Sequence, residues 1–284
     1  MPAVKRLRSN AIPPMSARPL VSLLRYLHAL STDRRERFAD RHLGYLLAFV
    51  AGAVNAGGFL AIGQYTSHMT GIVSSMADHL ALGELLPALS ALVAWLAFVL
   101  GAATTAVLVN LARRRHLHSR YALSLLVESG LLLLFGLAGA YLATMHEFLA
   151  PLTVLLLCFI MGLQNAIITK VSGAVIRTTH VTGLSTDLGI ELGKLFYFNR
   201  RVIPQLAVHA DRDRLTLHAL LILYFFIGGV TGAIGFKHIG YSATIVLSAL
   251  LALLAMGPIL DDLRIRWKIV MRKKARRLAC QNDL

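Results

Sequence analysis

Charged residues are scarce in this chain of 284 residues, and among them acidic residues are fewer than basic ones. Only 15% of the residues are charged, against about a quarter in soluble domains, and 14 Asp and Glu stand against 29 Lys and Arg. Apolar residues make up 56% of the sequence, and the run from Leu131 to Tyr141 contains no charge. Helices of soluble proteins keep a polar face. This composition therefore excludes a water-soluble domain and predicts an integral membrane protein.

The residues that mark enzymes and metal proteins are also few. Cys158 lies in an apolar stretch and Cys280 near the end of the chain, so they do not suggest a disulfide framework. His116 and His118 share a short basic loop, which offers fewer ligands than a metal site requires. The sequence shows no catalytic-triad arrangement, phosphate-binding loop or zinc-ligand spacing. We expect neither enzymatic activity nor a cofactor.

What the chain does have is a series of apolar stretches, each close to the 17–25 residues that cross a bilayer as a helix. Six are present, at residues 43–63, 85–109, 121–142, 151–168, 215–236 and 240–260. If all six cross and both termini are cytoplasmic, every Lys and Arg except Lys237 lies on the cytoplasmic side. Because basic residues stay inside, this topology accounts for the net charge of +15. Nucleic-acid binding is not needed to explain it.

A polar phrase occurs twice, once in each half of the chain. Thr-Ser-His-Met-Thr-Gly at residues 66–71 is matched by Thr-Thr-His-Val-Thr-Gly at residues 178–183. Each phrase follows a Gly-x-x-Asn-Ala stretch, at residues 52–56 and 162–166. The residues that we expect to line a substrate site are Asn55, Thr66, Ser67, His68, Thr70, Gly71, Asn165, Thr178, Thr179, His180, Thr182 and Gly183. Internal repeats of this kind are typical of membrane transport folds.

The apolar segment after the first phrase, about residues 70–83, is too short to cross a membrane. We therefore predict that each phrase is a loop that enters the membrane and returns as a half-helix, the first from outside and the second from the cytoplasm. For this geometry the first span should break early, near Gly57 and Gly58. Each half has three spans, an odd number, so the halves have opposite orientations. The predicted fold is an all-α integral membrane protein with six transmembrane helices, arranged as an inverted 3+3 repeat with two short re-entrant half-helices.

Three regions follow from this interpretation. The transmembrane domain covers residues 43–260, with repeat one at 43–142 and repeat two at 151–260. Residues 1–42 and 261–284 are basic cytoplasmic tails, and residues 1–42 lack the apolar core of a signal peptide. Both tails contain segments typical of amphipathic helices on anionic lipid. Within the domain, glycines of the fifth span and Gly101 of the second are expected to form helix-packing seams.

The chemistry of the two phrases leaves alternatives open. A half-helix that begins inside the bilayer presents free amides and the positive end of its dipole, which favours an anion. His68 and His180 add charge when protonated, whereas hydroxyl oxygens and carbonyls would suit a cation. Alternatively, Thr70 and Thr182 only cap helices. The paired asparagines either line the site or bond to neighbouring helices.

Two acidic residues are candidates for proton coupling. Glu128 lies about two turns into the third span, where a carboxyl is costly unless it is paired or protonated. Asp187 and Glu191 lie along the second half-helix, where they either line a pathway or face water at its mouth. Lys194, three residues after Glu191, is placed to pair with it.

The two phrases together with their Gly-x-x-Asn-Ala stretches resemble the YoaK-type family of bacterial multi-pass membrane proteins, over roughly residues 43–260. This resemblance implies the bacterial inner membrane and a domain of unknown function; it implies no substrate. The basic tails lie outside it.

Our functional prediction is a bacterial inner-membrane transporter or channel for a small solute, with an anion as one candidate and the two histidines meeting near the midplane. The alternative is a non-transporting membrane scaffold or lipid-binding sensor in which the phrases only cap helices. A membrane enzyme using the histidines as acid and base ranks lowest, because a nucleophile or metal-ligand set is lacking. The expected partners are the bilayer, anionic lipids at both tails and a small solute, not nucleic acid; a homo-oligomer is compatible with the sequence.

Overall fold

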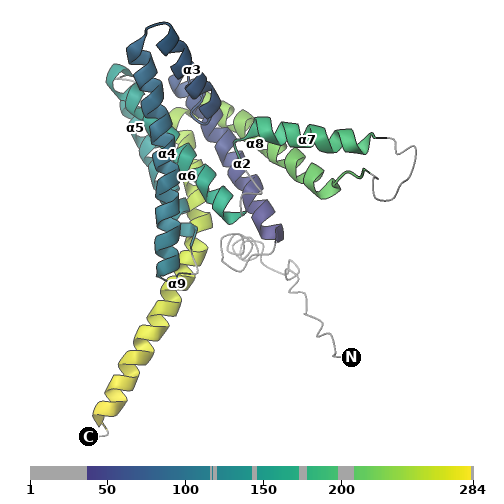
Figure 1. Ribbon diagram of the computed structural model, residues 1–284. Coiled ribbons are helices and arrows are strands. Elements are labelled where there is room, and N and C mark those ends of the chain that lie inside the picture. Colours follow the sequence, from purple (N-terminus) through teal and green to yellow (C-terminus); the bar gives the residue numbers. More distant parts are fainter. Residues whose placement is uncertain are drawn as a thin grey trace.

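The computed structural model describes residues 37–115, 117, 120–142, 146–172, 178–197 and 208–282. This part of the chain is helical and contains no strand, which confirms the all-α class (Figure 1). The helices are α2 (Arg37–Ile62), α3 (Met69–Ala81), α4 (Leu85–Arg114), α5 (Ala122–Leu142), α6 (His146–Val171), α7 (Val181–Leu195), α8 (Arg212–Ile239), the 3-10 turn η2 (Gly240–Ser242) and α9 (Ala243–Asn282).

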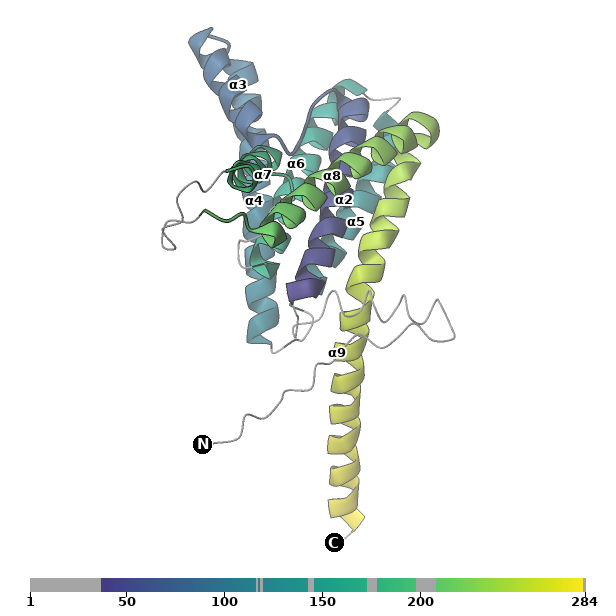
Figure 2. The ribbon, with the colours of Figure 1, turned by 90° about the vertical axis from the view of Figure 1, so that its right-hand side faces the viewer.

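Five helical stretches are long and apolar enough to cross a membrane. They are Arg41–Leu60, Leu85–Arg114, Ala122–Gly139, Pro151–Val171 and Arg212–Ile265. The last is 54 residues long because it runs through α8, η2 and α9, and it contains both of the last two spans expected from the sequence. The chain reverses direction at η2 (Figure 2), where Gly240 has a φ of 60°. The protein is therefore a multi-pass membrane protein by the length and composition of its helices.

Two helix crossings depend on glycines that let backbones approach. Where α2 crosses α8, a Cβ on Gly52 would overlap the carbonyl oxygen of Phe225, and one on Gly228 would overlap that of Phe49. Small residues at such contacts are typical of membrane helix packing. The expected glycine seam of the fifth span is thereby confirmed.

The crossing of α4 with α6 repeats this arrangement. A Cβ on Gly101 would overlap the carbonyl oxygen of Phe159, and one on Gly162 would overlap that of Phe98. Gly162 opens the second Gly-x-x-Asn-Ala stretch, as Gly52 opens the first. The glycine of each stretch therefore serves a helix crossing.

A reciprocal pair of serines joins α5 to α9. The hydroxyl of Ser129 donates to the carbonyl oxygen of Ser248 at 2.8 Å, and that of Ser248 donates to the carbonyl of Ser129 at 2.8 Å. Both serines are buried. The pair satisfies four polar groups where a membrane core offers few partners.

The expected break of the first span near Gly57 and Gly58 is wrong. Helix α2 continues through both glycines to Ile62 and ends at Gly63, whose φ is 72°. A Cβ on Gly57 would overlap the ring of Phe236. This glycine gives room for an aromatic ring of α8 and does not interrupt the helix.

The basic tail after the last apolar stretch is helical. Helix α9 continues to Asn282 and projects away from the other helices (Figure 1). Of the other tail, the structure describes only Arg37 onward, so the expected surface helix of residues 1–42 lies almost entirely outside the described residues.

Candidate functional site

Each polar phrase marks the start of a short helix. Helix α3 begins at Met69 and α7 at Val181, directly after His68 and His180, which occupy the N-cap positions. Neither histidine side chain makes a capping hydrogen bond. The backbone amides of the first turn of each helix are therefore not capped by the side chain in front of them.

Thr70 and Thr182 lie one residue inside these helices. They do not occupy the N-cap position, so the alternative interpretation, in which they cap the helices, is wrong. Both side chains are exposed.

A hydrogen bond from the residue before each histidine ties the phrase to the preceding long helix. The Ser67 hydroxyl donates to Oδ1 of Asn55 at 2.8 Å, and the Thr179 hydroxyl donates to Oδ1 of Asn165 at 2.7 Å. The amide of Ser67 approaches the same oxygen of Asn55 at 3.3 Å. Each asparagine thus orients the loop that leads into its short helix.

Thr66 and Thr178 stand one residue earlier, and both are buried, with exposed fractions of 1% and 0%. Neither hydroxyl has a hydrogen-bond partner within the part of the chain that the structure describes. An unsatisfied buried hydroxyl costs about 1–3 kcal/mol. The two phrases therefore carry the same unpaired polar atom at the same position.

The histidine of the first phrase is held by its own helix. A Cβ on Gly71 would overlap Cδ2 of the His68 ring, so the imidazole lies directly over this glycine. A Cβ on Gly183 would meet nothing within 4 Å. The two copies share a sequence pattern but differ in where the histidine ring lies.

A cavity of about 840 Å³ opens beside the first phrase, between α3, α4 and α6. It is lined by Ile62, Gln64, Tyr65, His68, Gly71, Ile72, Ser75, His79, Leu86, Pro87, Leu89, Ser90, Ala91, Val93, Ala94, Pro151, Val154 and Leu155. None of the described residues of the second phrase is among them. This cavity is therefore lined by the first phrase and not by the second, and the expected meeting of the two phrases stays a prediction.

Near its C-terminal end, each short helix is bonded to the N-cap residue of the long helix that follows. In the first half, Nδ1 of His79 lies 2.6 Å from Oε2 of Glu84, the N-cap of α4. In the second half, Glu191 accepts from the amide of Asp211, the N-cap of α8, at 2.8 Å. His79 and Glu191 are equivalent positions of the repeat.

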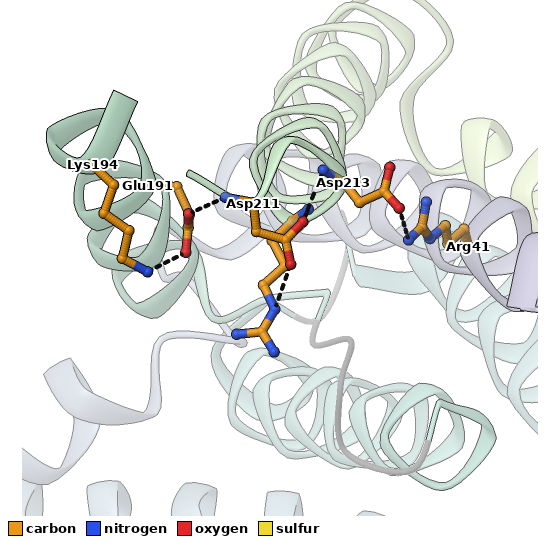
Figure 3. A network of polar contacts seen from close by, with 6 residues as sticks. Arg41, Glu191, Lys194, Asp211 and Asp213 are labelled. Atoms are coloured by element: carbon orange, nitrogen blue, oxygen red, sulfur yellow. Dashed lines mark hydrogen bonds and ion pairs between the residues drawn. The ribbon is translucent and has the colours of Figure 1, made fainter. Parts of the chain in front are cut away.

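Charged groups extend the second of these contacts (Figure 3). Glu191, 4% exposed, accepts a hydrogen bond from Lys194 at 2.8 Å, which confirms the expected pair. The Lys194 bond and the Asp211 amide lower the pKa of the Glu191 carboxyl. Asp211 in turn caps α8, accepting from the amides of Asp213 and Arg214 at 3.0 and 3.1 Å. This network connects α7 to α8. The sequence spacing predicted only one of its contacts, the Glu191–Lys194 pair.

The two residues expected to couple protons lie in different surroundings. Glu128 is fully buried in α5, and its two carboxyl oxygens have no partner among the described residues. The hydroxyl of Ser124, one turn earlier, is also buried and without a partner there. Asp187 is exposed on α7. Groups of His, Cys, Asp and Glu that could hold a metal ion are absent from the described part of the chain.

Comparison with known proteins identifies a family whose function is unknown. A family model described as a protein of unknown function, DUF1275, matches residues 43–257. This range is consistent with the resemblance to the YoaK-type family over residues 43–260. No functionally curated protein and no solved structure matches the chain.

Proposed function

The chain belongs to the DUF1275 family of proteins of unknown function, and we propose, from its site, that it is a bacterial inner-membrane transporter or channel for a small solute. The observation that carries this proposal is the recurrence of one bond in both halves. Ser67 bonds to Asn55 as Thr179 bonds to Asn165, each immediately before a histidine and a helix start. A polar helix start fixed to an apolar helix is what repeat-built carriers use to hold a solute.

Paired contacts support the proposal of an inverted 3+3 repeat. Exchanging α2, α3, α4 and α5 with α6, α7, α8 and α9 turns the α2–α8 crossing into the α4–α6 crossing, and in each crossing a glycine of either helix lies against a backbone carbonyl of the other. The same exchange turns the α3–α4 contact into the α7–α8 contact, and the α5–α9 serine pair into itself. Opposite orientation of the halves follows from the odd number of spans in each and from the distribution of basic residues.

The chemistry at the helix starts supports a solute that accepts hydrogen bonds. Uncapped amides at the start of α3 and α7 favour a partial or full negative charge. The hydroxyls of Thr66 and Thr178 are further donors without a partner among the residues described. An anion and a neutral solute with acceptor atoms both fit these donors.

Glu128 is the residue we propose for proton coupling. A buried carboxyl without a partner is costly when ionised, and ionisable groups within membrane spans commonly belong to ion pathways. Replacement by Gln, which keeps the volume and cannot release a proton, should therefore abolish any pH-gradient dependence of uptake.

The proposal is tested by uptake into proteoliposomes. The solutes are chloride, nitrate, phosphate, short organic acids and small neutral compounds, measured with wild-type protein and with His68→Ala and His180→Ala. We expect at least one solute to enter, and both substitutions to reduce its uptake by tenfold or more, about the effect of losing 1.4 kcal/mol of stabilisation. His238→Ala is the matched control, because this histidine is exposed at the end of α8. Unchanged uptake in correctly folded His68→Ala and His180→Ala would contradict the proposal.

A second candidate is a scaffold or lipid-binding sensor, which the long basic extension of α9 favours. This helix continues past the apolar stretch to Asn282 and carries basic residues into the tail, and a basic helix of this kind binds anionic lipid. In that case His68→Gln and His180→Gln change the thermal stability, and no solute of the panel is taken up.

A further inference from the structure

The cavity beside the first phrase has a polar side and an apolar side. The polar lining comes from the loop before α3, from α3 itself and from Ser90 of α4. Helix α6 contributes only Pro151, Val154 and Leu155. Ligand sites typically combine a mainly apolar lining with a few convergent polar groups, and 840 Å³ lies within their range of about 300–1,000 Å³.

The lining contains no Lys, Arg, Asp or Glu. An ion placed here would exchange part of its hydration for a mainly apolar lining and would meet no permanently charged side chain, which is costly. Sulfate, phosphate or a metal cation would therefore bind poorly. An uncharged molecule with a hydrogen-bonding edge loses little hydration free energy on entering the cavity.

Two imidazole rings lie along one face that begins at the N-cap of α3 and continues on the helix. His68, Ser75 and His79 are spaced to share a helix face. Gly71 leaves room for the His68 ring. Nδ1 of His79 is engaged by Glu84 at 2.6 Å, so Nε2 is the nitrogen left to meet a ligand. Orientation by a neighbouring carboxylate makes this ring a fixed hydrogen-bonding group.

We propose that this cavity binds a neutral amphipathic organic molecule, whose polar edge meets His68, Ser75 and His79 and whose apolar face meets α4 and α6. The proposal rests on the transport function above and names the class of its solute. A single molecule per chain is expected, because the positions equivalent to Ser75 and His79 are Asp187 and Glu191 in the second half. Glu191 is already bonded to Lys194 and Asp211.

Protection of an engineered thiol tests this binding. In a chain with Cys158→Ala and Cys280→Ala, Ser75→Cys places a thiol in the cavity. Ser74→Cys is the matched control, because Ser74 is exposed on α3 and does not line the cavity. The labelling rate by N-ethylmaleimide is measured in nanodiscs with 2-naphthol, a neutral aromatic alcohol, and with sodium sulfate or phosphate at matched ionic strength.

We expect 2-naphthol to slow labelling at position 75 by roughly tenfold at about ten times its Kd, and to leave position 74 unchanged. Sulfate and phosphate should affect neither position. His79→Gln in the Ser75→Cys chain should raise the Kd of 2-naphthol, whereas His238→Gln should not.

Three results would overturn the inference: no protection at position 75, equal slowing at positions 74 and 75, which indicates a bilayer effect, or protection by sulfate or phosphate alone. Protection by sulfate or phosphate alone would indicate an anionic solute in place of a neutral one and would not contradict the transport proposal. Protection by 2-naphthol without uptake of any solute would instead support the binding site and contradict transport.

Discussion

An imidazole ring lying over a glycine distinguishes the first phrase from the second at the residue scale. His68 lies over Gly71, so any side chain at position 71 would displace the ring. Around Gly183 the space is open. The two phrases share the spacing of their histidine and glycine, and only the packing separates them.

Gly71→Ala and Gly183→Ala should therefore differ in their effect on stability. Replacing a helical glycine by alanine normally stabilises a protein by roughly 0.5–1 kcal/mol, and we expect this gain for Gly183→Ala. Gly71→Ala should displace the His68 ring and forfeit most of the gain. Thermal unfolding measures the stabilities, and the His68 signal in NMR spectra of histidine-labelled protein, assigned with His68→Gln, reports the ring. An unmoved His68 signal in Gly71→Ala would refute this geometry.

The sequence predicts which polar residues lie close together at the two phrases but not how each is oriented. Asn55 and Asn165 precede the two phrases by similar spacings, so their proximity is predictable. The threonines are not so easily separated: Thr66 and Thr178 are buried, whereas Thr70 and Thr182 are exposed. This difference arises because the former precede the helix start and pack inward, which residue type does not encode.

At the scale of elements, each short helix is joined to the long helix that follows it. Helix α7 lies beside α8 in both views (Figures 1 and 2), and α3 contacts α4. The bond is between His79 and Glu84 in the first half and between Glu191 and Asp211 in the second. The second joint is a hydrogen bond from the Asp211 amide to the Glu191 carboxylate. It lies outside the five membrane-spanning stretches, and acid should weaken it because protonation removes the charge of the acceptor.

Glu191→Gln should lower the melting temperature at neutral pH, and the difference from wild type should shrink in acid. The pKa of Glu191 is lowered by Lys194 and by the Asp211 amide. Its stabilising contribution is therefore fully present above the unfolded value, about 4.5, and is lost as the pH falls through the lower folded value.

Thermal unfolding at pH 7 and at steps below pH 4.5 measures this effect. Asp187→Asn, on an exposed position one turn earlier in α7, is the control and should differ little from wild type at any of these pH values. A Glu191→Gln difference that is constant from pH 7 to pH 3 would show that the carboxylate does not hold the joint.

Helix positions were largely predictable, because apolar length and basic flanks are recorded directly in the sequence. The segment predicted for the first half-helix, about residues 70–83, corresponds to α3 at Met69–Ala81. The end of α2 was not predictable, because Gly57 serves the ring of Phe236 on a helix more than 150 residues away in sequence. A glycine that breaks a helix and a glycine that admits a neighbour look the same until the partner helix is known.

At the scale of the whole molecule, the contacts come in pairs. Glycines at the α2–α8 crossing have counterparts at the α4–α6 crossing, and Ser129 and Ser248 bond reciprocally where α5 meets α9. The two-fold axis proposed between the halves would account for all of these pairs. The acidic residues break the pattern, since Glu128 has no acidic counterpart near Ser248 and the cavity lining of α3 is replaced by Asp187 and Glu191 in α7. We infer that the helix arrangement is duplicated, whereas the acidic and cavity-lining residues are not.

The proposed inverted repeat predicts the side of the membrane from which each phrase is reached, and labelling can measure it. In the chain without Cys158 and Cys280, single cysteines are placed at Ser67 and at Thr179, each next to its histidine, and are labelled in cells with a membrane-impermeant maleimide from either side. An inverted repeat requires Ser67→Cys to react from the periplasm and Thr179→Cys from the cytoplasm, because a two-fold axis in the membrane plane exchanges the two faces. Lys237→Cys and Lys194→Cys serve as references for the outer and inner faces, since basic residues gather inside and Lys237 is the exception. Reaction of both motif positions from one face would contradict the inverted repeat, because three spans in each half place the two phrases on opposite faces.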